Sequence, residues 1–233
     1  MIKVFALLPK KPDLSDDEFH HYWREVHAPL VLKNSTITRY IQSHRLPQPF
    51  PGFPTDIPYA GVAELWFEDL NTALAQLDSP EYLENAHLDE PNFLDASGPQ
   101  FVFTRENIVI TGPQLDKDTP VLKALFFVKH RHGKSRAHFQ DYWRNNHAPL
   151  VIGTPALQRY VQCHVIPEAD AVGQTAQTAQ TSYDGVGELW FADYKAYERC
   201  WSSAEIQDEQ LPDTLNFVGG DPIGFFVQET HVL

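Results

Sequence analysis

The chain has 233 residues, enough for one large domain or two of ordinary size, and a hydrophobic share of 42% supports well-packed cores. A formal net charge of −13 argues against a nucleic-acid surface, because neutralising phosphates requires a net basic patch. The cysteines, Cys163 and Cys200, give neither a disulfide framework nor a zinc spacing, so we expect reduced thiols in a cytoplasmic protein.

An apolar run over residues 2–9 predicts a buried strand and is too short to cross a membrane. Ser15 then precedes Glu18 in a capping-box arrangement, and apolar residues at spacings of three and four continue the helix to Leu30. Pro29 should kink this helix or begin a new turn, because proline cannot continue the hydrogen-bond ladder. The first half ends with strands at about 36–46 and 59–67, a helix from Ser79 and a strand at about 100–110.

The second half repeats the first. Residues 139–151 match 19–31 at nine of thirteen positions, and such repetition fixes the architecture before any single residue is interpreted. We therefore predict two domains, 1–115 and 120–233, with a linker at 116–120. Four added residues lie within 167–182, whose Gln-Thr-Ala composition predicts a mobile surface loop. Other matches are 3–8 with 123–128, 39–44 with 159–164, and 61–67 with 185–191, and the last strand is expected at about 223–232.

Each half reads β-α-β-β-α-β, the ferredoxin-like arrangement. Its two helices cover one face of a four-stranded sheet, and the bare face is unstable in water unless two sheets pack together. We therefore predict an α+β fold in which tandem ferredoxin-like (βαββαβ) repeats form an intramolecular pseudo-dimeric α+β barrel. This association should bury an aromatic cavity beside ionisable side chains, and a further homodimer is left open.

At residues 22–31 and 142–151, the pattern Tyr-Trp-x-x-x-His-Ala-Pro-Leu-Val resembles the EthD family, supported by Glu-Leu-Trp-Phe at 64–67 and 188–191. The resemblance covers almost the whole chain as two fused units, whereas typical members are single units that dimerise. It implies the dimeric α+β barrel superfamily, which includes cofactor-free cyclases, isomerases, dehydratases and oxygenases, with some haem-binding relatives.

His27 and His147 are the first candidates for chemistry. Each follows a Tyr-Trp pair by about one helical turn, and a histidine beside an apolar stripe can act as a general base near neutral pH. The simpler alternative is a histidine at a helix end that bonds the carbonyls freed by Pro29 and Pro149. Retention in both copies fits either interpretation.

His44 and His164 form the second pair. Strand alternation puts Tyr40, Gln42 and His44 on one face. Such a face is too polar for an ordinary hydrophobic core, so we expect it to line either a wet interface between the sheets or a ligand cavity.

Glu64 and Glu188 lie in strands that are apolar on both sides of the carboxylate, which needs a partner if its pKa is not to rise. Pairing of the second and third strands makes His44 or Arg39 a reachable partner, and a Glu-His pair facing a cavity suits proton transfer. A structural salt bridge to Arg39 or Arg159 is the alternative.

Aromatic residues should fill much of the core and form a pocket suited to flat ring substrates. Tyr22 and Tyr142 could donate to a developing enolate oxygen. No metal and no nucleotide site are expected, because the histidine clusters lack acidic or thiolate companions and no Gly-rich phosphate loop appears. The candidate substrate-binding residues are Tyr22, Trp23, Tyr40, Trp66, Tyr142, Trp143, Tyr160 and Trp190.

The two halves differ in sequence at residues 87–90, which match residues 211–214, and at Ser43, which matches Cys163. If one pocket has lost activity, the divergence should appear there.

The leading hypothesis is a cofactor-independent lyase, isomerase or cyclase acting on a hydrophobic, carbonyl-bearing small molecule, aromatic or polyketide-like, in a catabolic or secondary-metabolite pathway. His27 and His147 would be the acid/base groups, while Glu64 and Glu188 with His44 and His164 would orient them or relay protons. The alternatives are an oxygenase or haem-binding oxidoreductase, and a non-catalytic accessory or carrier protein of an ether- or aromatic-degradation pathway.

Overall fold

The structure is a computed structural model that describes residues 1–113, 121–172 and 183–233. The predicted linker at 116–120 lies outside these ranges. The strands are β1 (Ile2–Pro9), β2 (Arg39–Arg45), β3 (Tyr59–Phe67), β4 (Gln100–Ile110), β5 (Leu122–His130), β6 (Arg159–Val165), β7 (Gly185–Phe191) and β8 (Val218–His231). The α-helices are α1 (Asp16–Tyr22), α2 (Ala28–Val31), α3 (Leu70–Ala75), α4 (His87–Asp89), α5 (Arg136–Tyr142), α6 (Ala148–Val151), α7 (Pro167–Val172), α8 (Tyr194–Trp201) and α9 (Leu211–Thr214).

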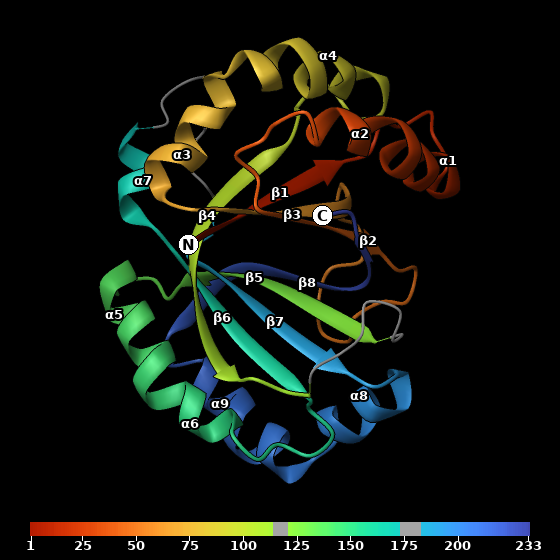
Figure 1. Ribbon diagram of the computed structural model, residues 1–233. Coiled ribbons are helices and arrows are strands. Elements are labelled where there is room, and N and C mark those ends of the chain that lie inside the picture. Colours follow the sequence, from red (N-terminus) through yellow and green to blue (C-terminus); the bar gives the residue numbers. More distant parts are fainter. Residues whose placement is uncertain (114–120, 173–182) are drawn as a thin grey trace.

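The eight strands form one closed antiparallel barrel in the order β1-β3-β2-β8-β5-β7-β6-β4. The two halves meet where β2 pairs with β8 and where β4 pairs with β6, with Ser43 opposite Glu229 and Glu106 opposite Cys163. Helices α1 to α4 cover the barrel on one side, and α5, α6, α8 and α9 cover it on the other (Figure 1). The predicted intramolecular pseudo-dimeric barrel is confirmed.

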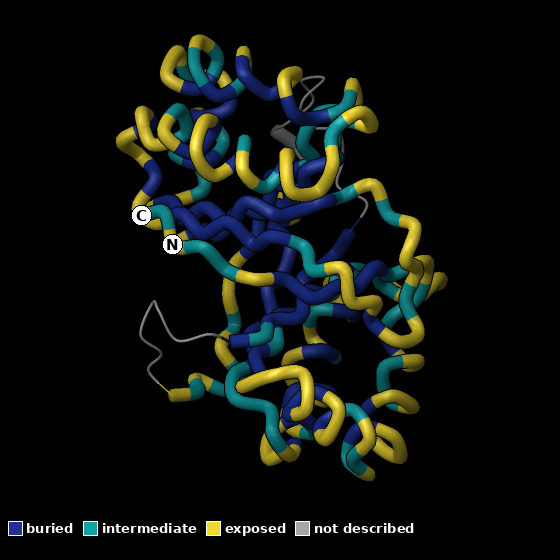
Figure 2. The backbone as a smooth tube through the Cα atoms, turned by 90° about the vertical axis from the view of Figure 1, so that its right-hand side faces the viewer, coloured by how far each residue is buried: buried dark blue, intermediate teal, exposed yellow. Residues whose placement is uncertain are grey.

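Each strand presents alternate residues to the barrel interior and to the helices. In β1, Phe5 and Leu7 pack in the interior with residues from both halves, whereas Ala6 and Leu8 pack under the helices of the first half. Both faces of the sheet are therefore buried, and exposed residues gather on the outer helices (Figure 2).

The first helix begins as expected. The Ser15 side chain accepts from the backbone N–H of Glu18, and the Glu18 carboxylate accepts from the backbone N–H of Ser15. Ser135 caps α5 through the backbone N–H of His138. Each of these helices passes into a π-helical turn, at Trp23–His27 and Trp143–His147.

The π-helical turns explain how the prolines are accommodated. The N–H of Ala28 donates to the carbonyl oxygen of Trp23, and Pro29 occupies the first turn of α2, where a missing N–H costs little. The prediction that Pro29 begins a new turn is confirmed, and the same arrangement recurs at Pro149.

The insertion in the second half departs from the expected loop at its start. Residues Pro167–Val172 form α7, which contacts α3 of the first half, and Ile166 and Ala169 join the core of that half. The remainder of the expected loop, 173–182, lies outside the described residues. Within the described ranges, no helix is both long and apolar enough to cross a membrane.

Candidate active site

Each half holds a cavity between the outer face of the barrel and its own helices. The first has a volume of about 40 Å³ and lies against Ala63 and Leu65 of β3. The second has a volume of about 170 Å³ and lies against Gly187 and Leu189 of β7. The expectation that the association of the two sheets creates the cavity is wrong, because both cavities lie outside the barrel, beneath the helices.

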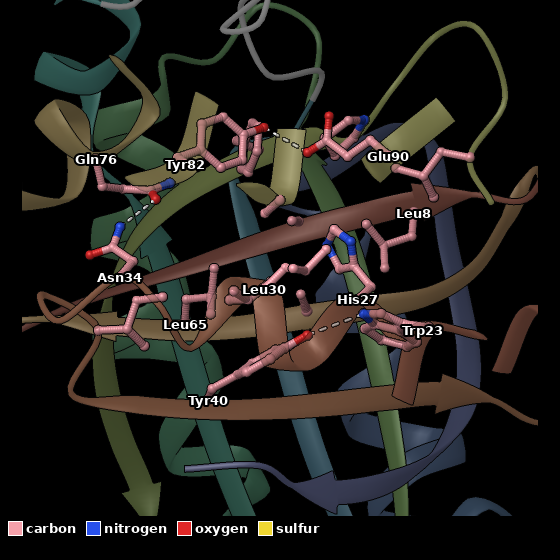
Figure 3. Close-up of a pocket in the computed structure, with 18 of the residues that line it drawn as sticks. Leu8, Trp23, His27, Leu30, Asn34, Tyr40, Leu65, Gln76, Tyr82 and Glu90 are labelled. Atoms are coloured by element: carbon pink, nitrogen blue, oxygen red, sulfur yellow. Dashed lines mark hydrogen bonds between the residues drawn. The ribbon is translucent and has the colours of Figure 1, made fainter. Parts of the chain in front are cut away.

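His27 lies at the wall of the first cavity, below Tyr82 and Glu90 in the close-up (Figure 3). Its Nδ1–H donates to Oδ2 of Asp89 across 2.9 Å, which leaves Nε2 as the ring nitrogen that faces away from this carboxylate. No described residue hydrogen-bonds this Nε2. Burial raises the pKa of Asp89, but hydrogen bonds from His27, Tyr22 and Asn92 outweigh this and lower it to about 2. Asp89 is therefore a carboxylate that fixes the tautomer of His27.

The second half repeats this Asp–His dyad. His147 donates from Nδ1 to Oδ2 of Asp213 across 2.8 Å, and Tyr142 donates to Oδ1 across 2.7 Å. Hydrogen bonds from Tyr142 and His147 lower the pKa of Asp213 against the opposing effect of burial. Burial lowers the pKa of His147 although Asp213 opposes this, so the ring is neutral at neutral pH and can accept a proton.

The π-helical turns place both histidines. Gln42 donates to the carbonyl oxygen of Trp23 across 3.0 Å, and Gln162 does the same for Trp143 across 2.8 Å, so a strand side chain holds the turn that carries the histidine. Such turns are frequent at functional sites.

Four of the predicted substrate-binding aromatics line the cavities. Trp23 and Tyr40 line the first, and Trp143 and Tyr160 line the second, with each indole N–H donating to the tyrosine oxygen. This also answers where the polar face of β2 lies. It faces the helices and contributes Tyr40 to the cavity, so of the two predicted alternatives the interface between the sheets is wrong and Tyr40 agrees with the ligand cavity.

Tyr22 and Tyr142 have a different partner from the one expected. Their hydroxyls donate to Asp89 and Asp213, at 2.6 and 2.7 Å, and they do not line the cavities described here. They support the carboxylates instead of reaching a developing enolate.

Glu64 and Glu188 lie inside the barrel, on the opposite face of the sheet from the histidines. Their partners are lysines from both halves: Lys3 lies 2.7 Å from Glu64 and 2.6 Å from Glu188, and Lys123 lies 2.6 and 2.7 Å from the same two carboxylates. The expected partners of Glu64, His44 or Arg39, are therefore wrong. The two lysines lower the pKa of Glu64 against the effect of burial.

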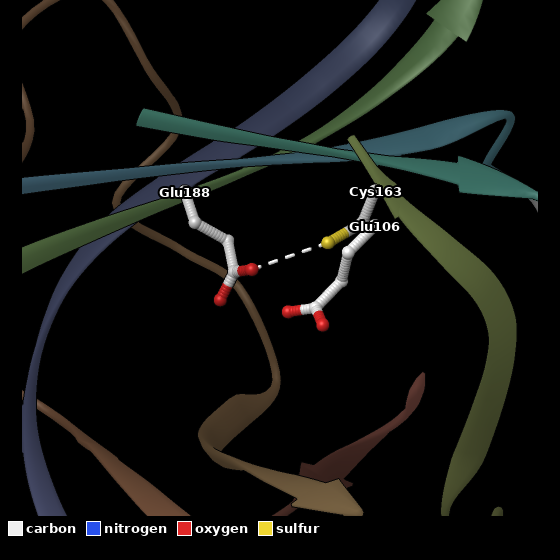
Figure 4. Close-up of side chains that lie close together, drawn as sticks. All are labelled: Glu106, Cys163 and Glu188. Carbon is white, nitrogen blue, oxygen red and sulfur yellow. Dashed lines mark hydrogen bonds between the residues drawn. The ribbon is translucent and has the colours of Figure 1, made fainter. Parts of the chain in front are cut away.

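This lysine–glutamate cluster extends to neighbouring side chains. Glu106, Cys163 and Glu188 converge within 4.8 Å, a set of atoms that could in principle hold a metal ion (Figure 4). Lys3 already places its ammonium 3.6 Å from Glu106 and 2.6 Å from Glu188, so a cation is present beside these groups. We assign the cluster to the cohesion of the two halves.

The remaining predicted site residues lie away from the dyads. Trp66 and Trp190 face the barrel interior, where their indole N–H groups donate to Glu106 and Glu229. His44 and His164 pack against Trp23 and Trp143. Burial lowers the pKa of His44 to about 3 and that of His164 to about 4, so both rings are neutral. Neither histidine lines either cavity.

Sequence reasoning missed Asp89 and Asp213 as partners of the histidines. The signal was present, because they occupy matching positions, each three residues before a retained Asn-Phe pair. Their segments were interpreted as places of divergence, since the residues on either side differ between the halves.

The polar lining is where the two cavities differ. In the first half Asn34 donates to Gln76 across 3.1 Å, and Tyr82 donates to Glu90 across 2.7 Å. Matching positions 154, 200, 206 and 214 in the second half carry smaller or apolar side chains: Thr154, Cys200, Ile206 and Thr214. The second cavity is accordingly larger and more apolar.

Comparison with known protein families identifies the domain that each half contains. The model of the EthD domain matches residues 11–97 and again residues 131–221. The chain belongs to the EthD family. Two copies of the domain thus supply the two halves of one barrel.

Relatives of known structure or name extend the comparison. The chain is 29% identical to the dehydratase aurZ of Gibberella zeae (strain PH-1) over 121 residues, which are 47% of this chain and 80% of that protein. Among solved structures, an anthrone oxidase-like protein superposes with a TM-score of 0.67 at 8% identity, covering 99% of this chain and 93% of that one. A chlorite dismutase variant from Candidatus Nitrospira defluvii superposes with a TM-score of 0.51 at 9% identity, covering 97% and 90%. At such identities the structures show a shared fold alone.

Proposed function

We propose that this protein is a dehydratase-type lyase that needs no cofactor and acts on a hydrophobic, carbonyl-bearing small molecule. One observation carries the proposal: both halves present a histidine, held through Nδ1 by an aspartate, at the wall of a largely apolar cavity. The aurZ relative, named a dehydratase, supports the same reaction class.

The dyads suit removal of a proton from a carbon next to a carbonyl group. Nδ1 of His27 is held by Asp89, so Nε2 is the basic nitrogen and points its lone pair away from the carboxylate. When Nε2 takes the proton, the aspartate stabilises the imidazolium, as in other Asp–His pairs. Loss of the β-hydroxyl group from the resulting enolate, with transfer of a proton to the departing oxygen, gives an unsaturated carbonyl compound and water.

The aromatic walls suit the rest of such a substrate. Trp143, Tyr160 and Phe217 line the second cavity, and flat rings pack well against such side chains. Isomerisation or cyclisation would begin with the same proton abstraction, so the leaving group of the substrate decides between these reactions and dehydration.

The test is to incubate the protein with a panel of β-hydroxy ketones, beginning with the aldol adduct of benzaldehyde and acetone. Mass spectrometry then measures the loss of water from each compound. His27→Ala combined with His147→Ala should abolish water loss, while His132→Ala, a change at an exposed histidine, should not. Wild-type rates in a folded double variant would remove the dyads from the mechanism. Tight binding of a panel member without consumption by the wild type would favour the carrier alternative.

A further inference from the structure

A second ionisable pair lies beside the dyad in the first half only. Glu90 is 7% exposed; its Oε1 accepts from the hydroxyl of Tyr82 across 2.7 Å, and its Oε2 lies 2.9 Å from Nδ1 of His87. Glu90 and His27 line the same cavity, and Figure 3 shows the carboxyl group of Glu90 above the ring of His27. The mechanism described so far does not use this carboxyl group.

Glu90 also lies where the cavity meets the surface. A broad hollow of about 990 Å³, bordered by Tyr59 and Pro91, adjoins the inner cavity. The two share a wall that consists of Tyr82, Glu90, Leu94, Pro99 and Phe101. A ring-bearing molecule resting in the hollow would therefore lie against Glu90, on the other side of which the inner cavity holds His27.

The second half lacks this group. Thr214 occupies the position that matches Glu90, and its hydroxyl donates to the backbone carbonyl of Gln210 across 2.8 Å. Ile206 and Leu211 stand where the first half has Tyr82 and His87. The dyad is thus repeated, and the second carboxyl is not.

We propose that Glu90 is the catalytic acid of the first-half site and that water loss takes place there; this inference rests on the proposed function. His27 takes the proton from the carbon next to the carbonyl, and the C–H electrons form an enolate. When the enolate collapses, its electrons form the C=C bond and the bond from the β-carbon to its hydroxyl oxygen breaks. Glu90 gives its proton to that oxygen, so water leaves. The proton on His27 then returns to Glu90 through solvent, which restores both groups.

The surroundings of Glu90 suit an acid. Burial raises its pKa, although hydrogen bonds from Tyr82 and His87 oppose this. A carboxylic acid with a raised pKa holds its proton closer to neutral pH, where general acid catalysis is most effective. Asp89 is the preceding residue in the chain, and its hydrogen bonds hold it ionised. The pKa values of these two neighbouring carboxyl groups are therefore shifted in opposite directions.

The experiment separates proton abstraction from water loss. The aldol adduct of benzaldehyde and acetone is incubated in D₂O, and NMR follows both deuterium entering next to the carbonyl and the formation of benzylideneacetone. Glu90→Gln keeps the shape of the side chain and its contacts but cannot give up a proton. It should retain exchange and lose water formation by about 10²–10⁴-fold. Glu84→Gln, an exposed change in the same helical segment, is the matched control.

Each outcome has one meaning. A wild type that neither exchanges nor loses water contradicts the proposed function itself. If exchange proceeds and Glu90→Gln still forms water at half the wild-type rate or more, the acid assignment fails. If Glu90→Gln loses exchange to the same extent as water formation, Glu90 only shapes the site, and the assignment is likewise overturned.

Discussion

Replacing Lys123 by Met tests whether the lysine–glutamate cluster holds the two halves together. Lys123 is fully buried and lies 2.6 Å from Glu64, 2.7 Å from Glu188 and 2.9 Å from Glu229. Removing its ammonium leaves Lys3 beside Glu64 and Glu188, and it takes the lysine partner of Glu229 away. Breaking a buried ion pair on one side costs about 3–5 kcal/mol, because a charge is left uncompensated in the interior.

For a chain of this length, 1 kcal/mol corresponds to about 2–4 °C in Tm, so Lys123→Met should lower Tm by roughly 6–20 °C. Thermal and urea unfolding followed by circular dichroism measure this loss. Lys195→Met, at an exposed lysine, should change the free energy of unfolding by no more than about 0.5 kcal/mol. Turnover per folded molecule should persist below the transition. A Lys123→Met protein as stable as the control, or one that is folded and inactive, would refute a structural role for the cluster.

Three further changes probe the packing, the buried histidines and the dyads. Gly185→Ala places a Cβ 2.5 Å from a tryptophan ring atom and should destabilise by about 1–3 kcal/mol, whereas Gly187→Ala, whose nearest contact is 3.6 Å, should be nearly neutral in urea unfolding. Burial lowers the pKa of His164 to about 4, so the stability this neutral ring supports is present above pH 6.5 and is lost as the pH falls towards 4. His164→Gln should therefore remove about 1.4 kcal/mol per pH unit from the slope of stability over that window, and an unchanged slope would contradict this. Asp89→Asn combined with Asp213→Asn should slow exchange of the α-proton by about 10²–10⁴-fold in D₂O, since neither histidine would keep its anionic partner; near-wild-type exchange would show that the carboxylates are dispensable.

The repeated sequence was sufficient to predict the barrel. Matching helices and strands at a constant offset, with two bare sheet faces on one chain, left closure of the two halves on each other as the stable arrangement. The retained histidines at positions 27 and 147 were also recognised as candidates, and both line cavities.

The sequence did not reveal which face of each strand meets which partner. A strand covered on both sides is apolar throughout, so the pattern around Glu64 does not distinguish the barrel interior from the helix-facing side. Lys3 and Lys123 recur at matching positions within apolar runs, and this was the available sign that Glu64 and Glu188 have partners inside the barrel.

The aspartates of the dyads were missed for a related reason. Asp89 and Asp213 lie about 60 residues or more from their histidines in the chain, at the ends of short helical segments whose packing the sequence pattern does not specify. Only the folded chain brings each aspartate to Nδ1 of its histidine.

The central claim is that His27 and His147 take a proton from a bound carbonyl compound. Its most direct test is the exchange rate of the α-proton of the aldol adduct of benzaldehyde and acetone in D₂O, measured for His27→Ala combined with His147→Ala. A double variant with a wild-type near-ultraviolet circular dichroism spectrum should exchange no faster than the buffer alone. Exchange at the wild-type rate by that folded variant would contradict the claim.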